Sequence, residues 1–119
     1  MKILVVGMGL IGGSVCKALK RKCDYTIHGC DIDENVLSAA LEDGAIDGVG
    51  KMEDGIYDVC IVCLHQRAAQ PCMKQALPFL KKGSILMDMC GLKGQMVLPS
   101  AAAEMEVTVD ELFNSVCVI

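Results

Sequence analysis

Gly7-Met8-Gly9-Leu10-Ile11-Gly12 stands between two different patterns of apolar residues. Residues 2–6, before it, are apolar after Lys2 and rich in β-branched side chains, which predicts a buried strand. After it, apolar residues recur with helical spacing from Leu10 to about Lys20, which predicts a helix. Three glycines between a strand and a helix are typical of a turn that brings a helix N-terminus against phosphate groups.

Each glycine has a separate role in such a turn. Gly7 would permit the tight bend, Gly9 would let the backbone approach a pyrophosphate, and Gly12 would let helix and strand pack closely. The free N–H groups of the first helical turn would then face the phosphate charge. A plain turn is the alternative, but it needs fewer glycines. We therefore expect a dinucleotide to bind at Gly7, Met8, Gly9, Leu10, Ile11 and Gly12.

Asp31 is the second signal, because it stands nineteen residues after Gly12 at the end of a predicted strand over residues 25–30. An acid at about that distance hydrogen-bonds the adenosine ribose. Its charge would repel the 2′-phosphate of NADP, and no arginine follows it, so we predict NAD as the cofactor. Helix capping, the alternative role for an acid here, suits Asp33 or Asn35 better.

The rest of the chain continues the alternation of strands and helices. We expect a helix at 36–41 closed by Gly44, a brief strand at 45–46, a central strand at 57–64 and a strand at 84–89. A helix at 68–80 would hold Pro71 in its first turn and be kinked or ended by Pro78. This order predicts an α/β fold of the Rossmann type, a doubly wound parallel sheet in three αβα layers.

The end of the chain fits this order less well. A helix is expected over 94–104, and a sixth strand and a short helix could follow at 106–109 and from Asp110. We assign residues 1–98 to the NAD-binding domain and residues 99–119 to a divergent tail.

Ligands of such sheets lie outside the carboxyl ends of the strands. The loops after the central strand and the next strand should therefore approach the cofactor. We expect Leu64 and His65, with Cys90 and Gly91, to line the nicotinamide side. His65 could also be a plain loop residue, and Lys93 could touch phosphate or simply be solvated.

Composition argues against several other classes of protein. The chain has 119 residues, enough for one domain, and a net charge of −4 that does not suit nucleic acid. No apolar run approaches the roughly 18 residues that span a bilayer, and no signal peptide is visible. We expect a cytoplasmic protein without membrane, nucleic-acid or metal partners.

The eight cysteines lie in apolar stretches and are expected to be buried, reduced thiols. Cys60 and Cys63 have metal-site spacing, but on a strand they would point to opposite faces.

Three stretches together resemble the cofactor half of prephenate dehydrogenases. Residues 9–14, Gly-Leu-Ile-Gly-Gly-Ser, are similar to the opening of that family, and residues 29–31 with 44–47 to its next segment. Residues 88–94 resemble its Asp-x-x-(Ser or Gly)-x-Lys loop. The resemblance covers residues 1 to about 98. It implies oxidative decarboxylation of prephenate to 4-hydroxyphenylpyruvate, a step of tyrosine biosynthesis, with hydride passing to nicotinamide.

The departures from the family concern catalysis. Its His-Pro-Met-Ala-Gly-like motif is missing, Gly91 stands where many relatives have serine, and His65-Gln66 replaces an apolar-Pro pair. The helical domain that completes the substrate pocket and the dimer interface is also missing from these residues. We predict no catalytic residue, contact with prephenate only through that domain, and self-association through uncovered apolar surface. The chain should bind NADH without turning over prephenate.

Two other functions stay open. One is another small-acid dehydrogenase of the 3-hydroxyacid or 6-phosphogluconate type, against which residues 12–14 and 88–93 speak. The other is a nucleotide-sensing module like the regulatory domains of potassium channels, which would change its oligomeric state without redox chemistry. The sequence does not separate prephenate from arogenate as the substrate.

Overall fold

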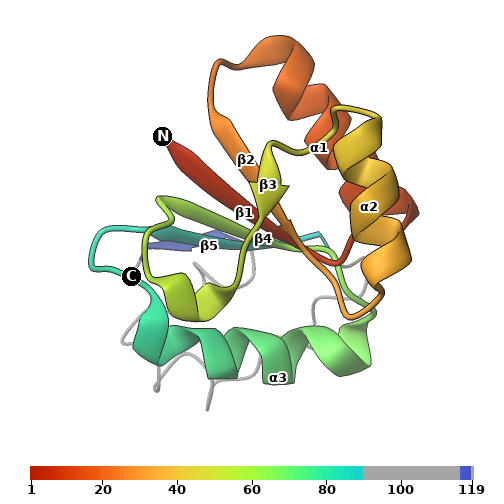
Figure 1. Ribbon diagram of the computed structural model, residues 1–119. Helices are drawn as coiled ribbons and strands as arrows, with labels where there is room; N and C mark the ends of the chain where they lie inside the picture. Colours follow the sequence, from red (N-terminus) through yellow and green to blue (C-terminus); the bar gives the residue numbers. More distant parts are fainter. Residues whose placement is uncertain (90–115, 119) are drawn as a thin grey trace.

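The computed structural model describes residues 1–89 and 116–118, and within them six strands form one sheet in the order β3-β2-β1-β4-β5-β6 (Figure 1). Neighbouring strands are parallel, except that β6 runs antiparallel to β5. Their bounds are β1 Lys2–Val6, β2 Thr26–Cys30, β3 Gly48–Val49, β4 Val59–Val62, β5 Ile85–Asp88 and β6 Val116–Val118.

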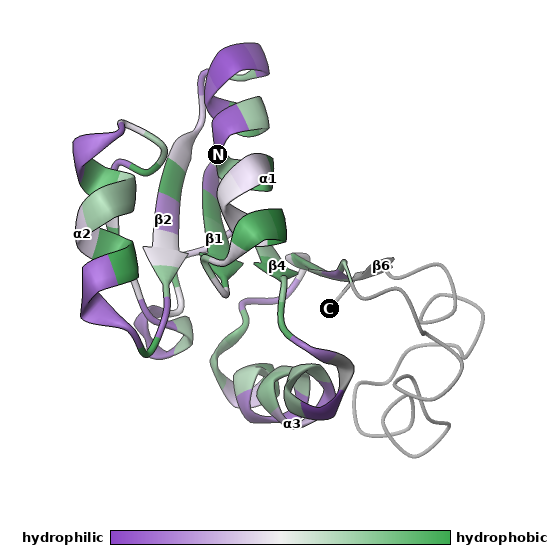
Figure 2. Cartoon of the chain, turned by 90° about the vertical axis from the view of Figure 1, so that its right-hand side faces the viewer, coloured by the Kyte–Doolittle hydropathy of each residue, from purple (hydrophilic) through white to green (hydrophobic). Residues whose placement is uncertain are grey.

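Helices cover both faces of this sheet (Figure 1, Figure 2). Helices α1 (Leu10–Lys22) and α2 (Glu34–Glu42) lie on one face, and α3 (Gln66–Ala76) lies on the other. Alternate residues of β1 serve the two sides: Ile3 and Val5 belong to the core under α1 and α2, whereas Leu4 and Val6 belong to the core under α3. The three layers confirm the predicted Rossmann-type architecture.

The predicted elements from β1 to β5 are present, with two corrections. The third strand is Gly48–Val49, not residues 45–46. Ala45 and Ile46 are apolar because they are buried in the core, in the segment that connects α2 to β3. Pro71 is not in the first turn of α3, because that helix already begins at Gln66. The α-helix ends at Ala76, and the 3-10 turn η2 (Leu77–Phe79) holds Pro78.

The end of the chain contributes a strand that was not predicted. Val116–Val118 forms β6, which the sequence pattern did not indicate. The expected helix at 94–104, the strand at 106–109 and the helix from Asp110 lie outside the described residues.

Cys60 and Cys63 lie on opposite sides of the sheet, as predicted. Cys60 belongs to the core under α3, and Cys63 packs against the core under α1 and α2. The six cysteines of residues 1–89 are free thiols. Burial raises the pKa of Cys60 to about 12, so this thiol stays protonated at neutral pH.

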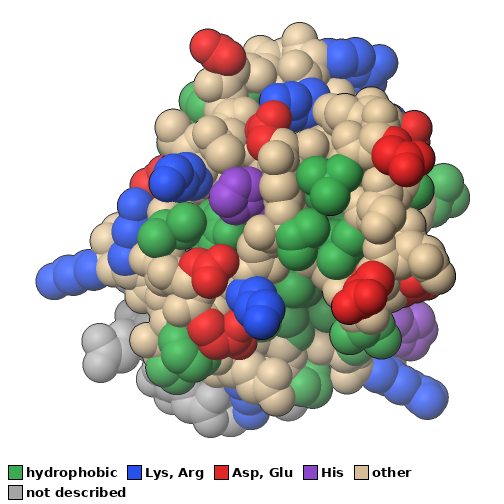
Figure 3. Space-filling model, viewed as in Figure 1, with side chains coloured by type: hydrophobic (Ala, Val, Ile, Leu, Met, Phe, Trp, Pro, Cys, Tyr) green, Lys and Arg blue, Asp and Glu red, His purple; other side chains and the backbone are tan. Residues whose placement is uncertain are grey.

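Charges of both signs are interspersed on the face of the molecule that Figure 3 shows. Among the described residues, none of the helices is both long and apolar enough to cross a membrane.

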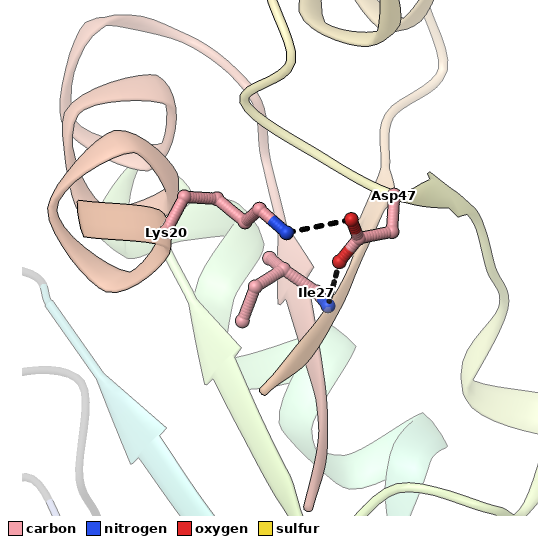
Figure 4. Close-up of polar contacts among 3 residues, drawn as sticks. All are labelled: Lys20, Ile27 and Asp47. Atoms are coloured by element: carbon pink, nitrogen blue, oxygen red, sulfur yellow. Dashed lines mark hydrogen bonds and ion pairs between the residues drawn. The ribbon is translucent and has the colours of Figure 1, made fainter. Parts of the chain in front are cut away.

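Asp47 ties α1 to the strand that leads to Asp31 (Figure 4). Its Oδ1 accepts from Lys20 Nζ at 2.6 Å, and its Oδ2 accepts from the Ile27 N–H at 2.8 Å. Its own N–H donates to the Ile27 carbonyl at 2.7 Å. The Ile27 amide, and next the Lys20 ammonium, hold the pKa of Asp47 below its ordinary value. Asp47 thereby continues the strand pairing of β2 beyond the short β3.

Replacing Asp47 with asparagine should lower the stability by about 0.5–1 kcal/mol at pH 7. The effect is modest because the carboxylate is 37% exposed and its ion pair with Lys20 is screened. Because the folded pKa is depressed, this stabilisation is complete above the unfolded pKa of about 4 and is lost as the pH falls through the folded pKa. Urea unfolding at pH 7 and pH 2.5 measures the difference between the two proteins, which should shrink in acid. An equal difference at both pH values would contradict this role.

Candidate functional site

The strand order reverses between β1 and β4, and the crevice of a doubly wound sheet opens where this happens. The loops that leave these two strands lie side by side. The Cys63 N–H donates to the Val6 carbonyl at 2.7 Å, and the Gly7 N–H donates to the Cys30 carbonyl at 2.8 Å. The carboxyl ends of β1, β2 and β4 therefore meet around the glycine loop, residues 7–12.

Two of the three glycines of the loop are required by packing. Gly7 has φ +92°, and a Cβ there would lie 2.7 Å from the Cys63 carbonyl oxygen. A Cβ on Gly12 would lie 1.7 Å from the Gly7 carbonyl oxygen. Gly9 differs, because a Cβ there would have no described atom within 4 Å. Gly9 therefore leaves open space above the backbone, as expected for a residue that lets a ligand approach.

The N-terminus of α1 suits an anion. Gly9 is the N-cap residue and provides no side-chain hydrogen bond, and the first turn has no acidic residue. The N–H groups of that turn are therefore left without a side-chain acceptor at the positive end of the helix dipole. A groove of about 300 Å³ borders the loop, lined by Gly9, Leu10 and Gly13 among others and, across from them, by α2.

The apolar residues of the loop are divided between core and surface. Met8 is only 5% exposed, so it can offer a ligand little more than its backbone. Leu10 and Ile11 are 89% and 54% exposed, and they make the first turn of α1 hydrophobic (Figure 2).

Asp31 lies directly beside the glycine loop. Its Oδ2 accepts from the Met8 N–H at 2.8 Å, and its Oδ1 accepts from the Asp33 N–H at 2.9 Å. Asp33 is the N-cap of α2, where its side chain accepts from the Asn35 N–H at 2.9 Å. This confirms that capping belongs to Asp33 and leaves Asp31 facing the loop.

Sequence reasoning passed over two features here. It did not find the hydrogen bond from Met8 to Asp31, which joins positions 23 residues apart. It also passed over Ile32, whose fully exposed apolar side chain follows the acid. The position of Ile32 after Asp31 was the available signal.

The loop after β4 forms the other wall. Leu64 is half-buried, and its Cδ2 would be 2.8 Å from a Cβ on Gly7. His65 is exposed and caps α3, with Nδ1 accepting from the Arg67 N–H at 3.3 Å. Three further expected site residues lie outside the described residues, namely Cys90, Gly91 and Lys93.

The model of the family "Prephenate dehydrogenase, nucleotide-binding domain" matches residues 15–109, more than half of the chain. The chain belongs to this family. The match begins after the glycine loop and extends past residue 98. It confirms the resemblance drawn from the sequence and decides at family level against the two alternatives.

A curated relative of this prephenate dehydrogenase domain is the prephenate dehydrogenase of Lactococcus lactis. The two are 31% identical over 100 residues, which are 81% of this chain and 28% of the relative. The chain therefore spans less than a third of the length of the curated relative it matches.

Solved structures share the fold of the domain. Prephenate dehydrogenase of Aquifex aeolicus, solved with hydroxyphenyl propionate and NAD+, superposes with a TM-score of 0.79 and 27% identity, over 88% of this chain and 38% of that one. Arogenate dehydrogenase of Synechocystis also gives a TM-score of 0.79, over 87% of this chain and 37% of that one, and its 24% identity supports the fold alone.

Proposed function

We propose that this chain binds NAD as the cofactor domain of a prephenate dehydrogenase. The observation that carries the proposal is Gly9, which leaves open space at the uncapped N-terminus of α1 while Asp31 lies beside the same loop. This arrangement fits a diphosphate above Gly9 and a ribose at Asp31. Membership of a nucleotide-binding family and the NAD+ complex of the Aquifex relative support it.

The roles of the site residues follow from their positions. Gly7 and Gly12 shape the loop, and Gly9 with the N–H groups of Leu10 and Ile11 meets the diphosphate. Met8 contributes through its backbone. We extend the site to Leu64 and His65 on the nicotinamide side, because the loop after β4 packs against Gly7. We also assign Cys90 and Gly91 to that side, from their place in the sequence after β5.

The reaction proposed for the whole enzyme is the oxidative decarboxylation of prephenate to 4-hydroxyphenylpyruvate. When bound, NAD supplies the acceptor for the hydride, and loss of carbon dioxide makes the ring aromatic. The residues of this domain hold and orient the cofactor. We also propose a cytoplasmic location, an NAD-binding domain over residues 1–98, and self-association.

Fluorescence titration of the protein with NADH and with NADPH tests the cofactor assignment. NADH should bind at least tenfold more tightly, because the 2′-phosphate of NADPH would place a second negative charge beside the Asp31 carboxylate. The Asp31→Ala variant is the matched test, since it removes that repulsion and should narrow the preference. Tighter binding of NADPH to the unaltered protein would refute the ribose role of Asp31, and failure of both nucleotides to bind would refute the proposed function.

A further inference from the structure

Asp31 contacts the glycine loop in a way that ribose binding does not require. Its Oδ2 accepts from the Met8 N–H at 2.8 Å, and Met8 is the residue between the first two glycines. We propose that Asp31 is also a positioning residue: it holds the glycine loop in the shape that receives the diphosphate. This inference rests on the proposed function and adds a second role for the acid.

The carboxylate can perform both roles at once. Each oxygen accepts one backbone N–H in the structure, Oδ2 from Met8 and Oδ1 from Asp33. An ionised carboxylate has about four lone-pair sites, so about two remain for ribose hydroxyls. The contact with the loop therefore does not have to break when a nucleotide binds.

Both the side chain and the backbone N–H of Met8 are fixed, so the contact with Asp31 limits how the glycine loop can move. The Sδ atom of the buried Met8 side chain lies 3.8 Å from the Cys16 Sγ. The same Sδ atom packs against Gly29, where an added Cβ would lie 3.1 Å from it. The Met8 N–H is held by Asp31. Glycine, the residue type with the greatest backbone freedom, stands on either side of Met8, so fixing Met8 reduces the entropy that the loop loses on binding.

Asparagine reproduces this role only in part. Its one amide oxygen can accept from the N–H of Met8 or of Asp33, and its NH2 group would then face the other N–H as a second donor, which disfavours the observed arrangement. Loss of the negative charge would by itself favour binding of an anion. If an Asp31→Asn variant nevertheless binds a diphosphate more weakly, the change in charge cannot be the cause. The loss of affinity would then be due to the altered shape of the glycine loop.

The test separates the loop from the ribose by changing the ligand. Isothermal titration calorimetry at pH 7 compares ADP with 2′,3′-dideoxyadenosine diphosphate, which lacks the ribose hydroxyls. Asp31→Asn should weaken binding of the dideoxy nucleotide about tenfold and of ADP by more, since ADP also loses its ribose contact. Asp33→Asn is the matched control: it removes the same charge two residues away, caps α2 equally well, and should change both affinities by less than about twofold.

Each outcome has a distinct meaning. Asp31→Asn could weaken the binding of ADP while its affinity for the dideoxy nucleotide equals that of the Asp33→Asn control. In that case Asp31 acts on the ribose alone and the inference is wrong, while the proposed function stands. If the unaltered protein binds neither ADP nor NADH, the proposed function itself fails.

A measurement on the unaltered, ligand-free protein does not depend on any variant folding. The Met8 amide hydrogen, which the Asp31 carboxylate accepts, should exchange slowly with solvent in hydrogen-exchange NMR. Rapid exchange of the Met8 amide would overturn the inference.

Discussion

Replacing Gly9 with alanine should weaken NADH binding roughly a hundredfold, about 2.7 kcal/mol, while the fold stays intact. The added methyl group would meet no described atom within 4 Å, so packing tolerates it. It would, however, occupy the space through which we propose that the diphosphate approaches the backbone. The N-cap position accepts alanine at a cost of about 1 kcal/mol or less, because glycine provides no capping side chain.

Fluorescence titration with NADH, together with urea unfolding, measures both parts of this result. Gly13→Ala is the matched control, since Gly13 lies in the same helix and the nearest atom to its added Cβ would be the Met8 carbonyl oxygen at 4.0 Å. That control should bind NADH nearly as well as the unaltered protein. Equal affinities of Gly9→Ala and Gly13→Ala would show that the diphosphate does not lie over Gly9.

The glycine loop could be predicted from the sequence because its determinants are local. A strand, a bend and a helix N-terminus are encoded within residues 2–20, and the structure returns them as β1, the loop and α1. Sequence also separated Asp31 from Asp33, because capping depends on a neighbouring helix start that the pattern reveals. The separate roles of the three glycines also followed from their order in the loop, whereas the atoms that Gly7 and Gly12 approach, and the distances to them, come only from the fold.

Features that depend on distant partners escaped prediction. Ala45 and Ile46 looked like a strand because burial in the core and burial in a sheet select the same side chains. The strand β6 pairs with β5 across a long stretch of chain, so its short apolar sequence gave little warning. The hydrogen bond from Met8 to Asp31 likewise exists only once β1 and β2 lie side by side.

Replacing Gly12 with alanine should destabilise the protein by about 3 kcal/mol or more. The added Cβ would lie 1.7 Å from the Gly7 carbonyl oxygen and 2.9 Å from the Gly7 carbonyl carbon. Both are backbone atoms of the glycine loop, so no side chain can rotate away, and α1 must separate from the end of β1. The helix propensity that alanine gains over glycine, about 1 kcal/mol, offsets only part of this cost.

Urea unfolding of Gly12→Ala beside Gly13→Ala isolates the steric effect, because the two variants add the same methyl group to adjacent positions of one helix. Gly13→Ala should gain about 0.5–1 kcal/mol from propensity alone, since the nearest atom to its methyl group lies at an ordinary contact distance of 4.0 Å. The two proteins should therefore differ in stability by well over 3 kcal/mol, in favour of Gly13→Ala. Similar stabilities would mean that α1 does not pack on the Gly7 carbonyl. The close contact between Gly12 and Gly7 would then not determine the shape of the loop.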